Sequence, residues 1–182
     1  MRVTGGCLRG RIAETPPGRI RPAMDRMRES VFAVIGDISG QSFLDLFTGS
    51  GIIALEAVSR GASPVEAVEM DKGKREILLK NASIAPTRIN CRFMAVELYI
   101  KRAKRAFDYI FCDPPFPYKY KRELAAMIAD SALARDGGLL MMHRPREDLW
   151  EEDVSGLSLT SRREYGRSIV DFWRVNKKGV SN

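Results

Sequence analysis

Histidine and cysteine are scarce in this sequence of 182 residues. The single histidine is His143, and the three cysteines, Cys7, Cys91 and Cys112, lie far apart with no C-x-x-C pair. Structural zinc sites and disulfide frameworks need several such residues at short, regular spacings, which excludes both. We therefore expect no bound metal, and free thiols in a reduced, cytoplasmic setting.

Long apolar runs are absent as well. No stretch approaches the roughly 20 apolar residues that a membrane-spanning helix needs, and residues 1–6 do not resemble the start of a signal peptide. Hydrophobic residues make up 45% and charged residues 29% of the chain, which is ordinary for a globular protein in water. The length suits one domain with a core of its own.

Acidic residues are outnumbered by basic ones. The chain has 30 Lys and Arg against 23 Asp and Glu, a net charge of +7, and this surplus favours a polyanionic partner. Arginines gather near the amino terminus, and a guanidinium fork matches a phosphate group well. We expect five of them to contact this polyanion, which the family resemblance described below implies to be RNA: Arg9, Arg11, Arg21, Arg26 and Arg28. Arg26 has an open alternative, an ion pair with Asp25, and the basic run 101–105 fits RNA contact and a solvated surface equally well.

The order of apolar and amphipathic segments predicts an α/β fold. Expected strands span residues 42–47, 64–70, 89–95, 107–112 and 138–143, and expected helices span 51–60, 72–85, 96–104 and 121–134. Strands that alternate with helices are typical of a parallel sheet with helices on both faces. Two further strands, 157–163 and 168–176, follow without a helix between them and predict a hairpin that adds an antiparallel strand.

The first residues are of another kind. Residues 1–22 are basic and rich in glycine, and we expect them to form a small β-hairpin extension. Residues 23–37 carry apolar side chains at helical spacing and predict a leading helix that docks on the sheet. The chain therefore divides into an extension, 1–22, and a main domain, 23–182.

Two glycines and two acids mark a candidate nucleoside site. Gly49 and Gly51 lie between an expected strand and helix, where they permit a sharp turn and a close backbone approach. Asp45 precedes this turn, and Glu69 ends the next strand, where an acid can accept hydrogen bonds from both hydroxyls of a ribose. Ala54 is an allowed residue at the third position of a G-x-G-x-x-G/A fingerprint, so the spacing alone leaves a dinucleotide open. Asp45, however, would repel a pyrophosphate and attract an ammonium group.

The most informative segment is Asp113-Pro114-Pro115-Phe116, directly after an expected strand. Proline fixes its φ and donates no hydrogen bond, so the segment forms a rigid shelf with free carbonyl oxygens. A carboxylate, a carbonyl and an aromatic ring can together hold a planar group that carries an amino function. We call these four residues the shelf. Cys112 and His143 lie near strand ends, and we expect both to be structural rather than catalytic.

Together these motifs resemble one family. Asp45-x-Phe47-x-Gly49-x-Gly51, Glu69 and the shelf occur in the order found in S-adenosylmethionine (SAM)-dependent methyltransferases of exocyclic amino groups. Residues 21–32, RPAMDRMRESVF, resemble the R-P-T-x-D-R-x-R-E-x-x-F signature of the RsmD family of bacterial ribosomal RNA methyltransferases.

The resemblance implies a fold, a reaction and a set of site residues. The fold would be a Rossmann-like class I methyltransferase with a mostly parallel seven-stranded sheet and an antiparallel carboxy-terminal hairpin. The reaction would move a methyl group from SAM to the N2 amino group of a guanine in 16S ribosomal RNA, guanine 966 in the family, within a small-subunit assembly particle. Cofactor contacts would come from Asp45, Phe47, Gly49, Gly51, Glu69 and Glu97, and catalytic contacts from Asp113, Pro114, Pro115 and Phe116.

One departure from the family pattern concerns the adenine of the cofactor. Many relatives carry Asp-Ala after the third strand, where the acid contacts the adenine amino group, whereas this chain has Met94-Ala95-Val96-Glu97. Either Glu97 substitutes for that acid, or backbone and apolar contacts hold the adenine.

Three other functions stay open. The nearest is a DNA adenine-N6 methyltransferase, which uses the same kind of shelf. A small-molecule methyltransferase would not need the arginine-rich amino terminus, and a non-enzymatic RNA-binding protein would not need an intact shelf.

Overall fold

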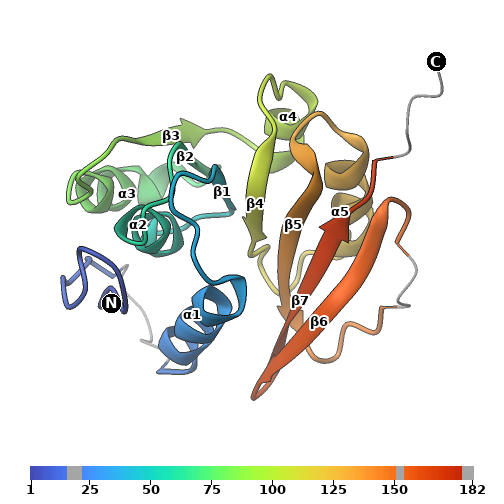
Figure 1. The fold of residues 1–182 in the computed structure, drawn as a ribbon, viewed down its shortest axis with the longest axis horizontal. Helices are drawn as coiled ribbons and strands as arrows, with labels where there is room; N and C mark the ends of the chain where they lie inside the picture. The colour runs from blue at the N-terminus through green and yellow to red at the C-terminus, as the bar shows by residue number, and fades with distance from the viewer. Residues whose placement is uncertain (16–21, 151–153, 178–182) are drawn as a thin grey trace.

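The computed structural model describes residues 1–15, 22–150 and 154–177, and seven strands of these residues form one sheet (Figure 1). The strands are β1 (Phe43–Leu46), β2 (Val65–Glu69), β3 (Ile89–Phe93), β4 (Phe107–Cys112), β5 (Ala134–Pro145), β6 (Leu157–Tyr165) and β7 (Ser168–Val175). Their order in the sheet is β3-β2-β1-β4-β5-β7-β6. Strands β1 to β5 run parallel, and β7 pairs antiparallel with both β5 and β6. The predicted mostly parallel sheet with an antiparallel hairpin is confirmed.

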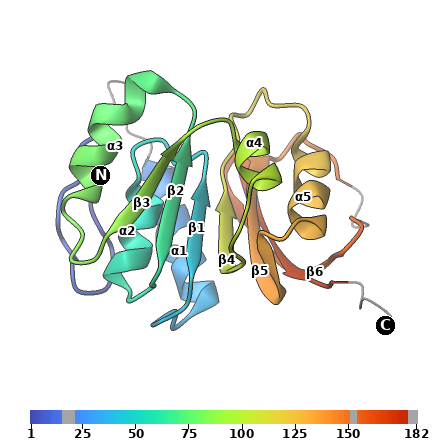
Figure 2. The same ribbon diagram turned by 90° about the horizontal axis from the view of Figure 1, so that it is seen from above.

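Helices cover both faces of the sheet (Figure 2). On one face lie α1 (Pro22–Ile35), α2 (Ile52–Ser59) and α3 (Arg75–Ala82), and on the other lie α4 (Val96–Lys101) and α5 (Lys121–Asp130). Each face has its own apolar core, and every residue of β1 and β2 is buried between the two. This double burial agrees with the mostly apolar residues of the central strands, in which Asp45, Glu66 and Glu69 are the buried exceptions. No helix of the described residues is both long and apolar enough to cross a bilayer.

Three predicted helices are shorter in the structure than in the sequence pattern. The segment 72–85 breaks into a 3₁₀ turn, η1 (Lys72–Lys74), and α3, because the Asp71 carboxylate accepts a hydrogen bond from Gly73 N at 2.8 Å. Helix α4 ends at Lys101 rather than at residue 104. Helix α5 ends at Asp130 because β5 begins at Ala134, where it pairs with Phe107.

The amino-terminal residues form a compact loop that packs on α2. Its two ends pair antiparallel as expected of a small hairpin: Arg2 bridges Ile12, Val3 N donates to Arg11 O at 2.9 Å and Ala13 N donates to Met1 O at 2.8 Å. Val3 and Ala13 are buried in the same core cluster as α1 and α2. Gly6 has a φ of 74°, and a Cβ at this position would lie 1.8 Å from the carbonyl oxygen of Ser59. Only glycine therefore allows the loop to approach α2 so closely.

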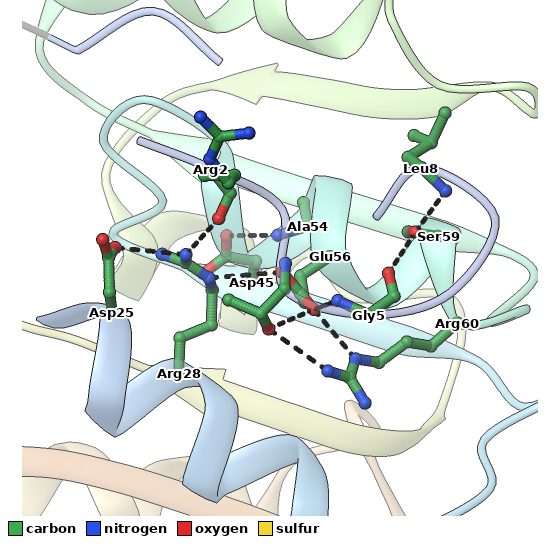
Figure 3. Close-up of polar contacts among 11 residues, drawn as sticks. Arg2, Gly5, Leu8, Asp25, Arg28, Asp45, Ala54, Glu56, Ser59 and Arg60 are labelled. Carbon is green, nitrogen blue, oxygen red and sulfur yellow. Dashed lines mark hydrogen bonds and ion pairs between the residues drawn. The ribbon is translucent and has the colours of Figure 1, made fainter. Parts of the chain in front are cut away.

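The carboxylate of Glu56, on α2, joins this loop to α1 (Figure 3). It is fully buried and accepts hydrogen bonds from Thr4 N at 2.8 Å, Thr4 Oγ1 at 2.7 Å and Gly5 N at 2.8 Å. Two guanidinium groups complete its shell, Arg28 Nε at 3.2 Å and Arg60 Nε at 2.9 Å. Buried charges are tolerated only when they are paired and hydrogen-bonded, which is the case here.

Arg28 does not fit its predicted contact with RNA. Its side chain is 1% exposed, and besides Glu56 it pairs with Asp25 at 3.1 Å and donates to Arg2 O at 2.5 Å. The helix therefore uses Asp25 to pair with Arg28 rather than with Arg26. The contacts of Arg28 hold α1 against α2 instead.

Replacing Glu56 tests how much of the fold depends on this carboxylate. We expect Glu56→Gln to lower the free energy of unfolding by about 3–5 kcal/mol, because Arg28 is left as a buried cation without its partner. Urea denaturation measures the loss. Glu29→Gln, at an exposed position on α1, is the matched control and should change stability by less than about 0.5 kcal/mol. Equal effects at the two positions would contradict the assigned role of Glu56.

Candidate functional site

A sharp turn connects β1 to α2 and forms one side of the site. Three of its residues have positive φ angles: Phe47 at 58°, Gly49 at 59° and Gly51 at 81°. A Cβ on Gly51 would lie 2.5 Å from Leu78 Cδ1, so this position requires glycine for space as well as for conformation. The predicted glycine turn is therefore present at the expected residues.

Asp45 lies beneath this turn. Its carboxylate is 1% exposed and accepts a hydrogen bond from Thr48 Oγ1. It accepts another from Ala54 N at 3.1 Å (Figure 3). Burial raises the pKa of Asp45 to about 7, and the nearby Asp113 and Glu69 carboxylates contribute in the same direction. A cation placed beside Asp45 would stabilise its charged form.

Glu69 ends β2 next to the same turn. Its carboxylate accepts hydrogen bonds from Gly49 N and from Asp71 N, both at 2.8 Å, and Lys74 Nζ lies 3.7 Å away. Because β1 and β2 are parallel neighbours, their carboxyl ends bring Asp45 and Glu69 to one edge of the sheet. The two acids that the sequence placed far apart therefore share one site.

The shelf follows β4 and is joined to β1, since Asp113 N donates to Leu46 O at 3.2 Å. His143, a buried residue of β5, places its Nδ1 2.7 Å from Asp113 Oδ1. The His143 ring also meets the Phe116 ring edge to face, with centroids 5.6 Å apart. Phe116 remains 37% exposed. His143 thus orients two shelf residues, a role that sequence reasoning missed because 30 residues separate it from Asp113.

A buried lysine holds the chain just beyond the shelf. Lys121 opens α5, is 2% exposed, and donates from Nζ to Phe116 O at 2.8 Å and to Tyr118 O at 2.6 Å. Its charge is paired with Asp148, 2.8 Å away. Sequence reasoning counted Lys121 only as one of several basic residues after the shelf, since nothing local shows that it is buried.

The contacts of Lys121 continue into the carboxy-terminal hairpin. Arg144 donates to the backbone oxygen of Asp148 and, from Nε, to Asp171 Oδ2 at 2.7 Å. Arg162 of β6 donates to the other oxygen of Asp171 at 2.5 Å. Arg144 and Asp171 are both buried. A chain of charged groups therefore connects the shelf to β6 and β7.

Glu97 lies in the first turn of α4 and faces the shelf side of the site. Tyr118 Oη donates to Glu97 Oε1 at 2.6 Å, and the Tyr118 ring lies 5.8 Å from the Phe47 ring. Glu97 and Phe47 are thus both linked to Tyr118. Contact of either residue with a cofactor stays a prediction.

The remaining predicted residues differ in their placement. Arg9 and Arg11, on the amino-terminal loop, and Arg26, on α1, are exposed, so their RNA contacts stay predictions, while Arg21 lies outside the described residues. Cys112 is fully buried, and this burial raises the pKa of its thiol well above the ordinary value. A buried, protonated thiol agrees with its expected structural role.

Known proteins share both the sequence and the fold. The model of a family described as "Conserved hypothetical protein 95" matches residues 1–174. "Ribosomal RNA small subunit methyltransferase D" of Escherichia coli is 30% identical over 100% of this chain and 93% of its own length. "Putative rRNA methyltransferase YlbH" of Bacillus subtilis is 28% identical, over 96% of this chain and 98% of its own.

This chain belongs to the RsmD family. A solved structure, "Putative methyltransferase yhhF from Escherichia coli", superposes with a TM-score of 0.86 at 27% identity and covers 98% of this chain and 99% of that one. The Rossmann-like methyltransferase fold implied by the sequence motifs is confirmed.

The raised pKa of Asp45 predicts how stability depends on pH. Between the ordinary value of 3.8 and about 7, the folded protein keeps a proton on Asp45 that the unfolded chain has lost. Raising the pH through this window therefore destabilises the wild type, by up to about 1.4 kcal/mol per pH unit. Asp45→Asn has no such proton, so the unfolding free energy of the variant minus that of the wild type should rise between these pH values and level off above them. Urea denaturation at several pH values measures this difference, and a constant difference would contradict the assignment.

Proposed function

We propose that this protein transfers a methyl group from SAM to the N2 amino group of a guanine in 16S ribosomal RNA. One observation carries the proposal: the bond from Asp113 N to Leu46 O places the shelf beside the turn that holds Asp45 and Glu69. A site for an amino-bearing base thus adjoins a site for a nucleoside with an ammonium group. Family membership and the ribosomal RNA methyltransferases among the relatives support the RNA substrate, and such a substrate also puts the protein in the cytoplasm, within reach of small-subunit assembly particles.

The residues of the glycine turn fit SAM. Glu69 ends the strand from which ribose hydroxyls are usually held, and Gly49 allows a nucleoside to approach the backbone. Asp45 has no cation among the described residues within ion-pair distance, and the ammonium group of SAM would supply one. When bound, SAM provides a methyl group that is already activated on a sulfonium. The protein therefore has to position the acceptor rather than activate the donor.

The shelf fits an exocyclic amine. His143 holds one carboxylate oxygen of Asp113, and the other oxygen can accept a hydrogen bond from the amino group. The carbonyl of Pro114 offers a second acceptor. Two acceptors on its hydrogens keep the nitrogen lone pair out of the purine ring and direct it at the methyl carbon. With SAM bound, the nitrogen–methyl bond would form as the methyl–sulfur bond breaks, and the methylated amine would then release a proton to water, with Asp113 accepting its hydrogen bond.

Phe116 would stack on the base. Its ring is fixed from one side by His143 while its exposed surface is available. Stacking of a base on an aromatic ring is worth about 1–3 kcal/mol. A guanine within a helix would have to leave the stack to reach this ring.

Product mapping tests the proposed reaction. Small ribosomal subunits that lack the modification are incubated with labelled SAM, and the labelled nucleotide is identified. Label on N2 of a guanine in 16S ribosomal RNA is the expected result. Label on adenine N6 in DNA, with none in RNA, would replace the proposal by its nearest alternative.

Asp113→Asn tests the shelf chemistry without removing the contact with His143. Asparagine can still accept from His143 through its oxygen, but it presents an NH₂ donor where the amine needs an acceptor. We expect kcat to fall by about 10²- to 10³-fold, with SAM affinity unchanged in a direct binding measurement. Asp130→Ala, at an exposed position at the end of α5, is the control, and near-normal methyl transfer by Asp113→Asn would refute the mechanism.

Lys121→Met tests whether the clamp beyond the shelf matters for the reaction. Loss of both bonds to the backbone should let Phe116 shift, and misplacement by about 1 Å can cost about 10²-fold in rate. We expect a lower kcat with little change in KM for RNA. Lys119→Met removes the same charge two residues away at an exposed position and should leave kcat unchanged. A fall in kcat of equal size in both variants would show that only charge is involved.

A further inference from the structure

A groove of about 400 Å³ lies on the α4 side of β2 and β3, away from the glycine turn. Figure 2 shows α4 set toward β4, so that β3, at the edge of the sheet, has no helix over it on this side. The groove residues that matter are one acid, one tyrosine and four cations: Glu66, Tyr99, Arg92, Arg102, Lys104 and Arg105.

Glu66 lies at the base of the groove and fixes two of the cations. Its side chain is 9% exposed, and it pairs with Arg92 Nε at 3.3 Å and with Arg105 Nη1 at 3.8 Å. Tyr99 Oη donates to the same carboxylate at 2.9 Å. Burial and the charge of Glu66 raise the pKa of Tyr99, so the phenol keeps its proton and remains a donor.

The two arginines are therefore held in place with part of each guanidinium group still exposed. Their side chains are 51% and 53% exposed, and they come from different elements, β3 and the segment after α4. A guanidinium group that uses one nitrogen in an ion pair can offer its others to a phosphate. An arginine fixed in this way loses less conformational freedom when it binds.

Arg102 and Lys104 add two positive charges to the groove. Both are exposed, and the described part of the chain gives neither side chain a hydrogen-bond or ion-pair partner. The groove thus holds four positive charges against the single negative charge of Glu66. Arg92 and Arg105 balance the buried charge of Glu66, and Arg102 and Lys104 add to them, so the groove as a whole carries a positive charge.

The groove is connected to the shelf through α4. Helix α4 has six residues, a length of about 9 Å. At its start Glu97 bonds to Tyr118, which follows the shelf, and at its end come Arg102, Lys104 and Arg105. The six residues of β4, about 20 Å, lie between Arg105 and the shelf, so a nucleic-acid strand with one base at the shelf would reach the groove with phosphates several nucleotides away.

We propose that this groove is a second RNA-binding site, which holds backbone phosphates of the substrate strand outside the target nucleotide. The inference rests on the proposed function for the identity of the RNA, and it resolves the basic run 101–105 in favour of RNA contact. Phosphate contacts carry no base information, so the groove contributes affinity and register rather than choice of guanine.

The double variant Arg102→Gln/Lys104→Gln tests the proposal, since neither side chain supports the fold. Binding of 16S ribosomal RNA is measured over a series of salt concentrations. We expect the affinity to fall on the order of tenfold at low salt, and the slope of log affinity against log salt to become shallower by about 1.4–1.8, as two lost phosphate contacts require. SAM affinity should not change.

The control variant Arg135→Gln/Arg174→Gln removes two exposed arginines near the start of β5 and the end of β7, far from β3 in the sheet. It should keep the wild-type salt slope. An equal loss in both variants, or an unchanged slope in the groove variant, would overturn the proposal. Inorganic pyrophosphate is the second probe. If the groove variant no longer bound pyrophosphate but bound RNA normally, the groove would be assigned to a small phosphate ligand instead.

These measurements separate the groove from the proposed reaction. RNA binding that weakens as expected, in a protein whose methylated product is not guanine, would refute the proposed function and keep the groove. Guanine methylation, together with an unchanged RNA affinity of the groove variant, would support the proposed function and refute the groove as an RNA-binding site.

Discussion

The buried carboxylate of Glu56 is the interaction on which the remainder of the structure depends. It takes donors from the amino-terminal loop, from α1 and from α2 itself, so three segments that are distant in sequence meet at one charge (Figure 3). If any of the three segments detached, a buried charge would lose its partner. The three segments therefore associate cooperatively. Helix α2 is fixed by this arrangement, and Ala54 in its first turn bonds to Asp45. The exposed arginines of the loop and the acid beneath the glycine turn therefore belong to one rigid unit.

A second set of buried charges fixes the other side of the site. Lys121, Asp148, Arg144 and Asp171 connect the shelf to the carboxy-terminal hairpin, and His143 holds Asp113 from β5. The two sides meet where Asp113 N bonds to Leu46 O. Rigid support from both directions suits the proposed reaction, which relies on positioning because the groups of the shelf are weak acceptors rather than strong bases.

The sequence predicted the parts of the site that depend on local rules. Gly51 indicates a positive φ angle at its position. Asp45 and Glu69 lie near the ends of parallel neighbouring strands, which bring their side chains together. Residues whose roles arise from distant partners escaped prediction. In the sequence Lys121 and Arg28 cannot be told from exposed basic residues, because only the fold buries them. The role of His143 depends on its contact with Asp113, which is distant in sequence. The lengths of α4 and α5 were also beyond local pattern, since strand pairing at Phe107 and Ala134, not helix propensity, decides where the chain leaves the helix.

The position of β7 between β5 and β6 has a consequence for how the protein is made. Synthesis proceeds from the amino terminus, so β5 stays an unpaired edge until the last strand emerges and inserts beside it. Arg144 likewise lacks its ion-pair partner until Asp171 of β7 has been made. The shelf thus gains its final support through Asp148, Arg144 and Asp171 only after β7 has left the ribosome, so the candidate site of a growing chain is incomplete until then.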